Sequence, residues 1–390
     1  MKLVPYSPSA FIHRREVDLV EGRFRQLVES GGRVRPPKAM LFRGERGFGK
    51  SWLSFHLHRT VFRIPSLYIA LFPLPSEYQL DLQETEWEIA EKATAEENCK
   101  NLILWICKRL EISFPNDPSL LEARRALLGG IDQYLARQGY LVLILDSVFE
   151  AEWNLLETVE QNLLAPLAEL DQVFFVITGR GRPYPWISPA LRLGLDEQTL
   201  ENFPVEKMPG ITPHAIEVSG GSPLVAFMLM QTNNSSEVVD YLLEVVPASL
   251  ERKRIREAFE ALCVLDEFRE GEMETLLKTY YEAEEVPMPA NSIREVRDDL
   301  IKTYLLRWDG GGFKVDRSLR AVLKDYLQTQ KPNLWQALNR AAYGLYTGFA
   351  EKYPQYREAY LNLAIPYQAE IDRAGKSAGS SSTGFKNHTA

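Results

Sequence analysis

The chain has 390 residues, too many for one ordinary compact domain, so we expect two or three domains, each with its own core. Its 45 basic and 53 acidic residues leave a net charge of -8, which excludes a general attraction to nucleic acid or to anionic membranes and leaves only local basic patches for such contacts. The sequence has no long apolar run and no leader-like start, so we expect a cytoplasmic protein without membrane contact. Its three cysteines have no metal-ligand spacing, so we expect buried thiols.

Short apolar runs alternate with helical patterns over the first half of the chain. They are rich in Val, Ile, Leu and aromatic residues and do not alternate with polar residues, as is typical of strands buried on both faces. We therefore predict a parallel sheet flanked by helices, in a domain that covers residues 1–185. The predicted strands are 39–43, 66–72, 140–145 and 173–178.

A glycine-rich loop follows the first predicted strand. It matches GxxxxGK[ST] in full and leads into a helical pattern, the context in which backbone amides and a helix amino end surround phosphate groups. We expect it to bind ATP or ADP, with Lys50 between the β- and γ-phosphates and Ser51 as a ligand of Mg²⁺; a glycine-rich turn without a ligand is the alternative. The expected contacts are Gly44, Glu45, Arg46, Gly47, Phe48, Gly49, Lys50 and Ser51.

An acidic residue ends the third predicted strand. This strand looks like a Walker B segment, so we predict that Asp146 holds Mg²⁺, directly or through water; an aspartate that only caps a turn is the alternative. Glu150 lies four residues further along. We predict either that it is the catalytic base that activates water or that it is a solvated glutamate at a helix start.

The fourth predicted strand ends in Thr178-Gly179-Arg180, at the same edge of the sheet. An arginine is always charged and suits phosphate oxygens, so we predict that Arg180 senses the γ-phosphate. The alternatives are a surface arginine that pairs with the helical lid predicted below for residues 186–248, and Arg182 in the same sensing role.

The second half of the chain is predicted to be mainly helical. We predict a helical lid over residues 186–248, with turns between its helices at Pro209-Gly210 and at Gly220 to Pro223. Three helical patterns followed by a hairpin around 309–312 predict a winged-helix domain over residues 249–330.

The last part of the chain is predicted to contain a helical segment over 331–373. It is either the first helix pair of a repeat or a simple appendage. Residues 374–390 are rich in Gly and Ser and are expected to be a disordered tail or an expression remnant.

Together these motifs resemble the STAND class of signal-transduction ATPases over about residues 8–330. Residues 11–16 look like the opening segment that approaches adenine in this family, and either Arg14 or Arg15 takes the place of its arginine. Residues 146–150 are similar to the NACHT-type Walker B, with Phe149 in place of an acid, and 178–180 are similar to the NB-ARC-type Thr-x-Arg. In residues 221–223, similar to the lid Gly-x-Pro, Pro223 would contact the nucleotide.

The resemblance implies an α/β P-loop NTPase core with a lid, a winged helix and C-terminal helices. It implies a switch in which ADP holds the lid and winged helix against the core and ATP releases them. The ATP form would associate with itself and regulate an effector or sensor protein. Because Phe149 replaces an acid, we expect slow hydrolysis or none.

A rival interpretation is a DNA-binding ATPase similar to AAA+ initiators, since a winged helix can read DNA. The helix expected to enter the groove, 291–300, carries two arginines but also three acids that would repel phosphates. The best basic patch for this role is 251–256, and a charge run of this kind is more often a solvated face. A metabolic kinase would explain neither the lid nor the winged helix.

Overall fold

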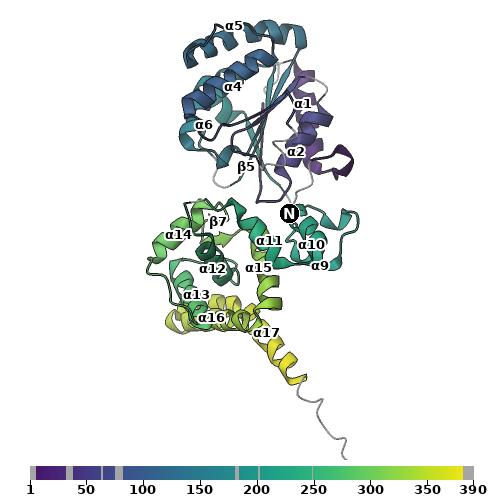
Figure 1. Ribbon diagram of the computed structural model, residues 1–390. Helices are drawn as coiled ribbons and strands as arrows, with labels where there is room; N and C mark the ends of the chain where they lie inside the picture. Colours follow the sequence, from purple (N-terminus) through teal and green to yellow (C-terminus); the bar gives the residue numbers. More distant parts are fainter. Residues whose placement is uncertain are drawn as a thin grey trace, which may run out of the picture. The chain divides into compact units, whose positions relative to one another are not determined.

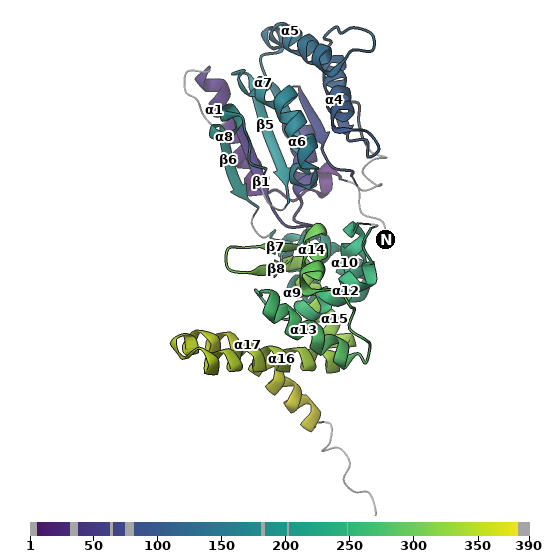
Figure 2. The ribbon, with the colours of Figure 1, turned by 90° about the vertical axis from the view of Figure 1, so that its left-hand side faces the viewer.

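The computed structural model describes residues 6–31, 38–62, 65–74, 82–180, 184–200, 203–247 and 249–380. The chain forms two compact units, Met1–Met208 and Pro209–Ala390, coloured purple to teal and teal to yellow in Figures 1 and 2. The first unit carries a large sheet, and the second consists mostly of helices.

The first unit is built on parallel strands. Among its described residues there are six, in the spatial order β3-β2-β4-β5-β1-β6. The four predicted strands are confirmed, with small shifts of their ends. The strands are β1 (Ala39–Arg43), β2 (Ser66–Ala70), β3 (Glu86–Glu88), β4 (Leu141–Asp146), β5 (Val173–Gly179) and β6 (Leu195–Thr199).

Helices cover both faces of this sheet (Figure 1). The main ones are α1 (Arg15–Ser30) and α2 (Lys50–His56) on one face and α4 (Ala95–Arg109), α5 (Leu120–Gln138) and α6 (Trp153–Val159) on the other. In β1, Ala39 and Leu41 belong to one apolar core and Met40 and Phe42 to the other, so the strand is apolar throughout. Shorter helices are η1 (Pro8–Ala10), η2 (Leu57–Val61), η3 (Val148–Glu150), η4 (Glu160–Leu164), α7 (Ala165–Ala168), α8 (Pro189–Leu193) and η5 (Val205–Lys207).

Two strands not predicted from the sequence, β3 and β6, lie at the two edges of the sheet. The residues of β6 are mainly polar and partly exposed, and its backbone pairs with β1. An edge strand needs no continuous apolar run, because one side of it faces solvent. The domain boundary expected after residue 185 therefore falls too early, since β6 belongs to the sheet and the unit extends to Met208.

A buried histidine should make the first unit sensitive to acid. His58 forms hydrogen bonds with Ser66 Oγ (2.9 Å) and Thr85 Oγ1 (3.0 Å). Burial lowers the pKa of His58 to about 4, although the charge of Glu86 opposes this shift, so the folded chain holds the neutral ring. Between about pH 6.5 and pH 4 the unfolded chain binds the proton and the folded chain does not, so stability is lost as the pH falls through this range, by about 2 kcal/mol between pH 7 and pH 5.

Urea unfolding at these two pH values tests this expectation. His58→Gln should lose most of the acid sensitivity, whereas His13→Gln should behave as the wild type, because the His13 side chain is 63% exposed. An equal loss of stability in wild type and His58→Gln would contradict a neutral buried ring.

The second unit begins with the helices of the predicted lid, α9 (Pro213–Val218), α10 (Pro223–Thr232), α11 (Ser235–Leu242) and η6 (Leu243–Val245). The segment predicted as a winged helix then has its elements in the expected order, and a bridge between Phe268 and Phe313 extends its hairpin. These elements are α12 (Arg252–Leu262), α13 (Glu270–Ala283), α14 (Ile293–Lys302), β7 (Leu306–Trp308), β8 (Phe313–Val315) and α15 (Arg317–Gln330).

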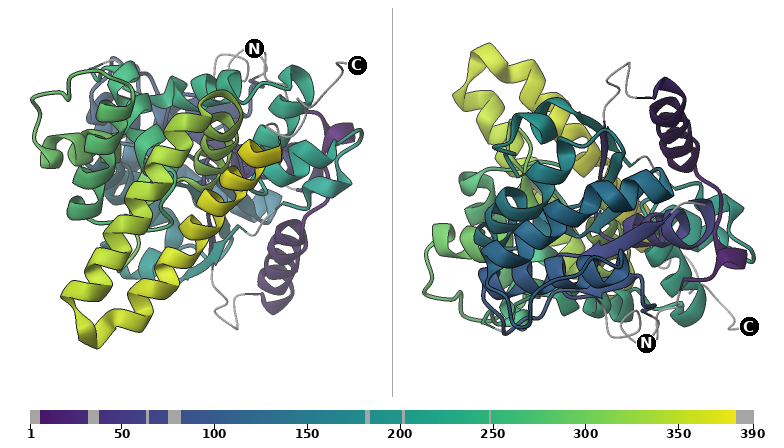
Figure 3. Two further views of the ribbon diagram at one scale, coloured as in Figure 1. Left: turned by 90° about the horizontal axis from the view of Figure 1, so that it is seen from below. Right: turned by 90° about the horizontal axis from the view of Figure 1, so that it is seen from above.

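Two long helices, α16 (Pro332–Lys352) and α17 (Arg357–Ser380), follow and lie side by side (Figure 3, left). They are joined by η7 (Pro354–Tyr356), and Tyr346 stacks on Tyr367 with ring centroids 5.7 Å apart. One such pair leaves open whether it begins a repeat. The expected tail is corrected in part, because α17 continues to Ser380; residues 381–390 lie outside the described ones.

The structure also gives the state of the three cysteines and the apolar character of the helices. Cys99, Cys107 and Cys263 are buried and free, as predicted. Of the helices that the structure describes, none is both long enough and apolar enough to cross a membrane.

Candidate functional site: a phosphate-binding loop and its polar edge

The glycines of the loop between β1 and α2 serve two purposes. Gly47 and Gly49 both have a φ of 79°, in the left-handed region that favours glycine. Gly44 is needed for space, since a Cβ there would lie 3.2 Å from the Cβ of Leu200. The loop is therefore as tightly wound as the motif predicts, but Gly44 contributes by allowing a close approach and not by an unusual φ.

Lys50 is buried at the first turn of α2 and folds back over its own loop. Its Nζ donates hydrogen bonds to the carbonyl oxygens of Gly44 (2.9 Å) and Glu45 (2.8 Å). Only 8% of the residue is exposed. Arg46 and Ser51 are half-buried on either side of it. The ammonium group is thus held inside the loop, where the motif predicts the phosphates to bind.

The structure resolves which arginine of the opening segment reaches this loop. Arg14 is buried, and its Nη1 donates to the carbonyl oxygen of Phe48. Its Nε and Nη2 donate to the carboxylate of Glu16, at 3.2 and 3.1 Å. Arg15 is exposed at the start of α1. Arg14 therefore packs against the loop at Gly49, because a Cβ added to Gly49 would lie 3.3 Å from Arg14 Nη1. A contact between Arg14 and adenine stays a prediction.

Asp146, at the end of β4, is fully buried and held by its neighbours. Its Oδ2 accepts a hydrogen bond from the Tyr68 hydroxyl at 2.6 Å. Its Oδ1 accepts from the Thr178 hydroxyl and from the Ser147 amide. Ser54, on α2, lies 3.4 Å from the same threonine oxygen. A polar chain therefore joins β2, β4, β5 and α2 beneath the loop.

Tyr68 and Thr178 are partners of Asp146 that were not predicted from the sequence. Both lie in apolar strands, and a polar atom at such a buried position needs a partner. A tyrosine and a threonine in otherwise apolar strands are therefore the sequence signal for buried hydrogen bonds at this site. The carboxylate and the Ser51 hydroxyl are oxygen donors of the kind that Mg²⁺ prefers. Among the described residues, no group of three or more His, Cys, Asp or Glu could hold a metal ion by itself.

Glu150 and Arg180 bind each other. Arg180 donates from Nε to Glu150 Oε1 at 2.7 Å and from its backbone amide to Oε2 at 3.0 Å. Side-chain exposure is 12% for Arg180 and 2% for Glu150. The interpretations of Glu150 as a solvated glutamate and of Arg180 as a surface arginine are therefore wrong. In this structure Glu150 is also not free to act as a base.

The arginine has unused hydrogen-bonding capacity. Arg180 Nη1 is buried and has no hydrogen-bond partner among the described residues. A buried donor without a partner is costly, so an oxygen-rich ligand that reached this atom would be favoured. Arg182, the second candidate for the sensing role, lies outside the described residues.

Sheet register brings this pair to the glycine-rich loop. Gly179 lies opposite Arg43 in the pairing of β5 with β1, so Arg180 and Gly44 leave adjacent strands at the same edge, where strands are spaced by about 5 Å. Phe149 packs onto this end of β5: a Cβ added to Gly179 would lie 2.6 Å from its ring. The phenylalanine that departs from the family pattern thus has a packing role.

The lid proline belongs to the second unit. Gly220 and Gly221 have φ of 60° and 81°, and the Ser222 hydroxyl caps α10 by accepting from the Val225 amide. Pro223 is the first residue of that helix, where a proline is well tolerated. Its contact with a nucleotide in the first unit stays a prediction.

No protein-family model matches the chain, and no curated protein matches it. Among solved structures it is similar to Cdc6p of Pyrobaculum aerophilum, at 14% identity and a TM-score of 0.38, over 86% of this chain and 97% of that one. A STAND protein of Pyrococcus horikoshii with a tetratricopeptide repeat sensor matches at 14% identity and 0.33, over 93% of this chain and 54% of that one, about half its length. The RuvB Holliday junction branch migration motor of Thermotoga maritima matches at 13% and 0.35, over 80% and 94%. Scores this low carry no argument about the site.

Proposed function

We propose, on the premise that the first unit has an α/β P-loop NTPase fold, that the chain binds ATP and ADP with Mg²⁺ and changes conformation with the nucleotide. The observation that carries this proposal is Lys50, buried inside a loop wound by Gly47 and Gly49. Phosphate oxygens carry a full charge and are stronger acceptors for its ammonium than the two carbonyls that it now contacts. Ser51 and Asp146 would hold Mg²⁺, which would offset the charge of the phosphates.

The ion pair of Glu150 and Arg180 supplies a difference between ATP and ADP. The γ-phosphate of ATP would compete with Glu150 for Arg180, whereas ADP lacks this group. A ligand shifts a conformational equilibrium only through such differential contacts. Slow hydrolysis is part of the proposal because Phe149 stands in place of an acid of the resembling segment.

The resemblance in the second unit suggests what the switch controls. The Gly-Ser-Pro turn precedes α10, and a set of helices and a hairpin in winged-helix order follows the lid. We propose that ATP releases this unit, that the released chain associates with itself, and that the assembly regulates a partner protein.

Light scattering after chromatography tests the proposal. We expect a larger mass with ATP or a slowly hydrolysed analogue plus Mg²⁺ than with ADP. Lys50→Ala, as the matched control, should give one mass in all conditions. A mass that does not respond to any nucleotide would contradict the switch.

The same experiment with duplex DNA tests the rival function. Both arginines of the helix expected to read DNA pair with acids: Arg297 contacts Glu270 and Asp298, and Arg294 lies 3.9 Å from Glu270. Paired cations release fewer counterions on binding to phosphates. We therefore expect no mass increase with DNA, and an increase with DNA alone would favour the rival.

A further inference from the structure

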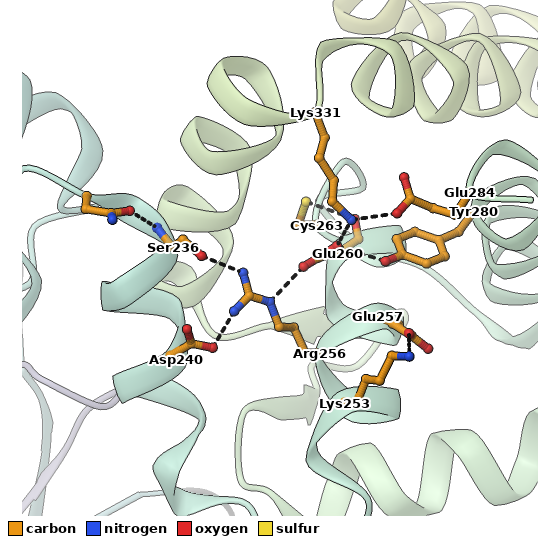
Figure 4. A network of polar contacts seen from close by, with 11 residues as sticks. Ser236, Asp240, Lys253, Arg256, Glu257, Glu260, Cys263, Tyr280, Glu284 and Lys331 are labelled. Carbon is orange, nitrogen blue, oxygen red and sulfur yellow. Dashed lines mark hydrogen bonds and ion pairs between the residues drawn. The ribbon is translucent and has the colours of Figure 1, made fainter. Parts of the chain in front are cut away.

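One arginine in the second unit contacts three helices, and Figure 4 shows its polar contacts. Arg256 lies on α12, and its Nε donates to Glu260 Oε1 at 2.8 Å, one turn further along the same helix. Its Nη2 donates to the Ser236 hydroxyl at 3.0 Å, and its Nη1 donates to Asp240, both on the lid helix α11. The guanidinium carbon also lies 5.0 Å from the centre of the Tyr326 ring on α15.

The carboxylate of Glu260 extends this network to two more elements. Glu260 is 2% exposed, and its Oε2 accepts from the Tyr280 hydroxyl of α13 at 2.9 Å and from Lys331 Nζ at 3.2 Å. Lys331, just before α16, also donates to Glu284 at 2.7 Å. A buried carboxylate needs these donors, because an unpaired charge is very unfavourable away from water.

Burial and the neighbouring carboxylates keep Tyr280 and Arg256 in the charge states that the network needs. Burial, reinforced by Glu260, raises the pKa of Tyr280, so its hydroxyl remains a donor. Burial alone would lower the pKa of Arg256, but the contacts with Glu260 and Asp240 outweigh it and raise the pKa. The network is therefore expected to be intact throughout the neutral pH range.

The lid also packs directly onto α15. The Ser235 hydroxyl donates to Asp325. Near the other end of the lid, Gly220 approaches closely enough that an added Cβ would lie 3.3 Å from the carbonyl oxygen of Arg317. α15 therefore contacts the lid at two points, and Arg256 holds α11 to α12 beside the contact of Ser235 with Asp325.

We infer that the lid helices α9–α11 and the helices α12–α15 form one rigid body, in which Arg256 is the positioning residue for α11. The rigid body itself follows from contacts within the second unit. Its consequence rests on the proposed function: if a nucleotide displaces the Gly-Ser-Pro turn, the segment predicted as a winged helix moves with it and not relative to it.

Hydrogen exchange of the full chain without nucleotide tests the rigid body. Arg256→Met should raise exchange in α11 by about tenfold or more, because an amide opens more often once its helix loses an anchor. Arg256→Lys should have nearly the same effect, since a single ammonium group cannot replace the planar fork that reaches Ser236, Asp240 and Glu260. Lys253→Met is the matched control on the same helix: that lysine side chain is 80% exposed and pairs with Glu257.

The result is read only where α16, in the same unit as Arg256, exchanges as in the wild type, which shows that the second unit is folded. If Arg256→Met misfolds, Arg256→Lys serves alone. Unchanged exchange in α11 of a folded variant would overturn the inference, and a rise confined to the control would do so too.

A disulfide between the lid and α15 tests the consequence. A hydrogen bond joins the side chains of Ser235 and Asp325, and the native cysteines are buried. Ser235→Cys combined with Asp325→Cys therefore places one thiol on each helix, and the loss of free thiol on oxidation checks that the bond has formed. We expect oxidised and reduced protein to show the same nucleotide-dependent change in mass. A response in the reduced form only would overturn the inference and leave the proposed function intact. If neither form responds, the proposed function is contradicted. The hydrogen-exchange result for Arg256→Met and Arg256→Lys then tests by itself whether the lid and α12–α15 form one rigid body.

Discussion

Replacing Lys50 with alanine should lower the affinity for Mg²⁺–ATP by about 100-fold. The buried ammonium donates to the carbonyl oxygens of Gly44 and Glu45, and it can exchange these for phosphate oxygens. A hydrogen bond to a charged group is worth about 1.5–3 kcal/mol, and each 1.4 kcal/mol is a factor of ten in affinity. Titration calorimetry with a slowly hydrolysed ATP analogue measures the loss.

Lys38→Ala is the matched control for this variant. Lys38 lies just before β1, at the end of the strand opposite the loop, and pairs with Asp171 at 2.8 Å. Its loss should leave the affinity within about twofold of the wild type. Equal affinities of wild type and Lys50→Ala would show that the loop is not the phosphate site.

Replacing Arg180 with methionine should destabilise the nucleotide-free protein by about 3–5 kcal/mol. The carboxylate of Glu150 has a side-chain exposure of 2%, and without Arg180 it would be a buried charge with no cationic partner. Glu150→Gln should cost less, because it removes the charge and keeps an oxygen that can accept from the Arg180 amide. Combining the two changes should restore part of the stability. Urea unfolding of the four proteins measures this coupling.

The same variants separate the two roles of the pair. If Arg180 senses the γ-phosphate, Arg180→Met should lose affinity for the ATP analogue by about tenfold and keep its affinity for ADP. Glu150→Gln should bind the ATP analogue more tightly, because the arginine no longer has to leave a carboxylate. If neither variant changes the ratio of ATP affinity to ADP affinity, the ion pair of Glu150 and Arg180 has a structural role only.

Local patterns predicted the central strands and the loop well. β1, β2, β4 and β5 are apolar because helices cover both of their faces. The positions of Gly47, Gly49 and Lys50 follow from the spacing of neighbouring residues. The edge strand β6 was missed because a polar strand is recognisable only once its partner β1 is known.

The sequence by itself determined where the phosphate-binding loop is and which residue types its strands deliver to it, since these depend on contacts between near neighbours in the chain. Only the tertiary structure decided which side chains are paired. Glu150 and Arg180 are 30 residues apart in sequence, and Tyr68 and Asp146 are 78 apart. Sheet register brings each pair together and burial then obliges their polar atoms to bind. That order of causes is why a predicted base and a predicted sensor turned out to be partners of each other.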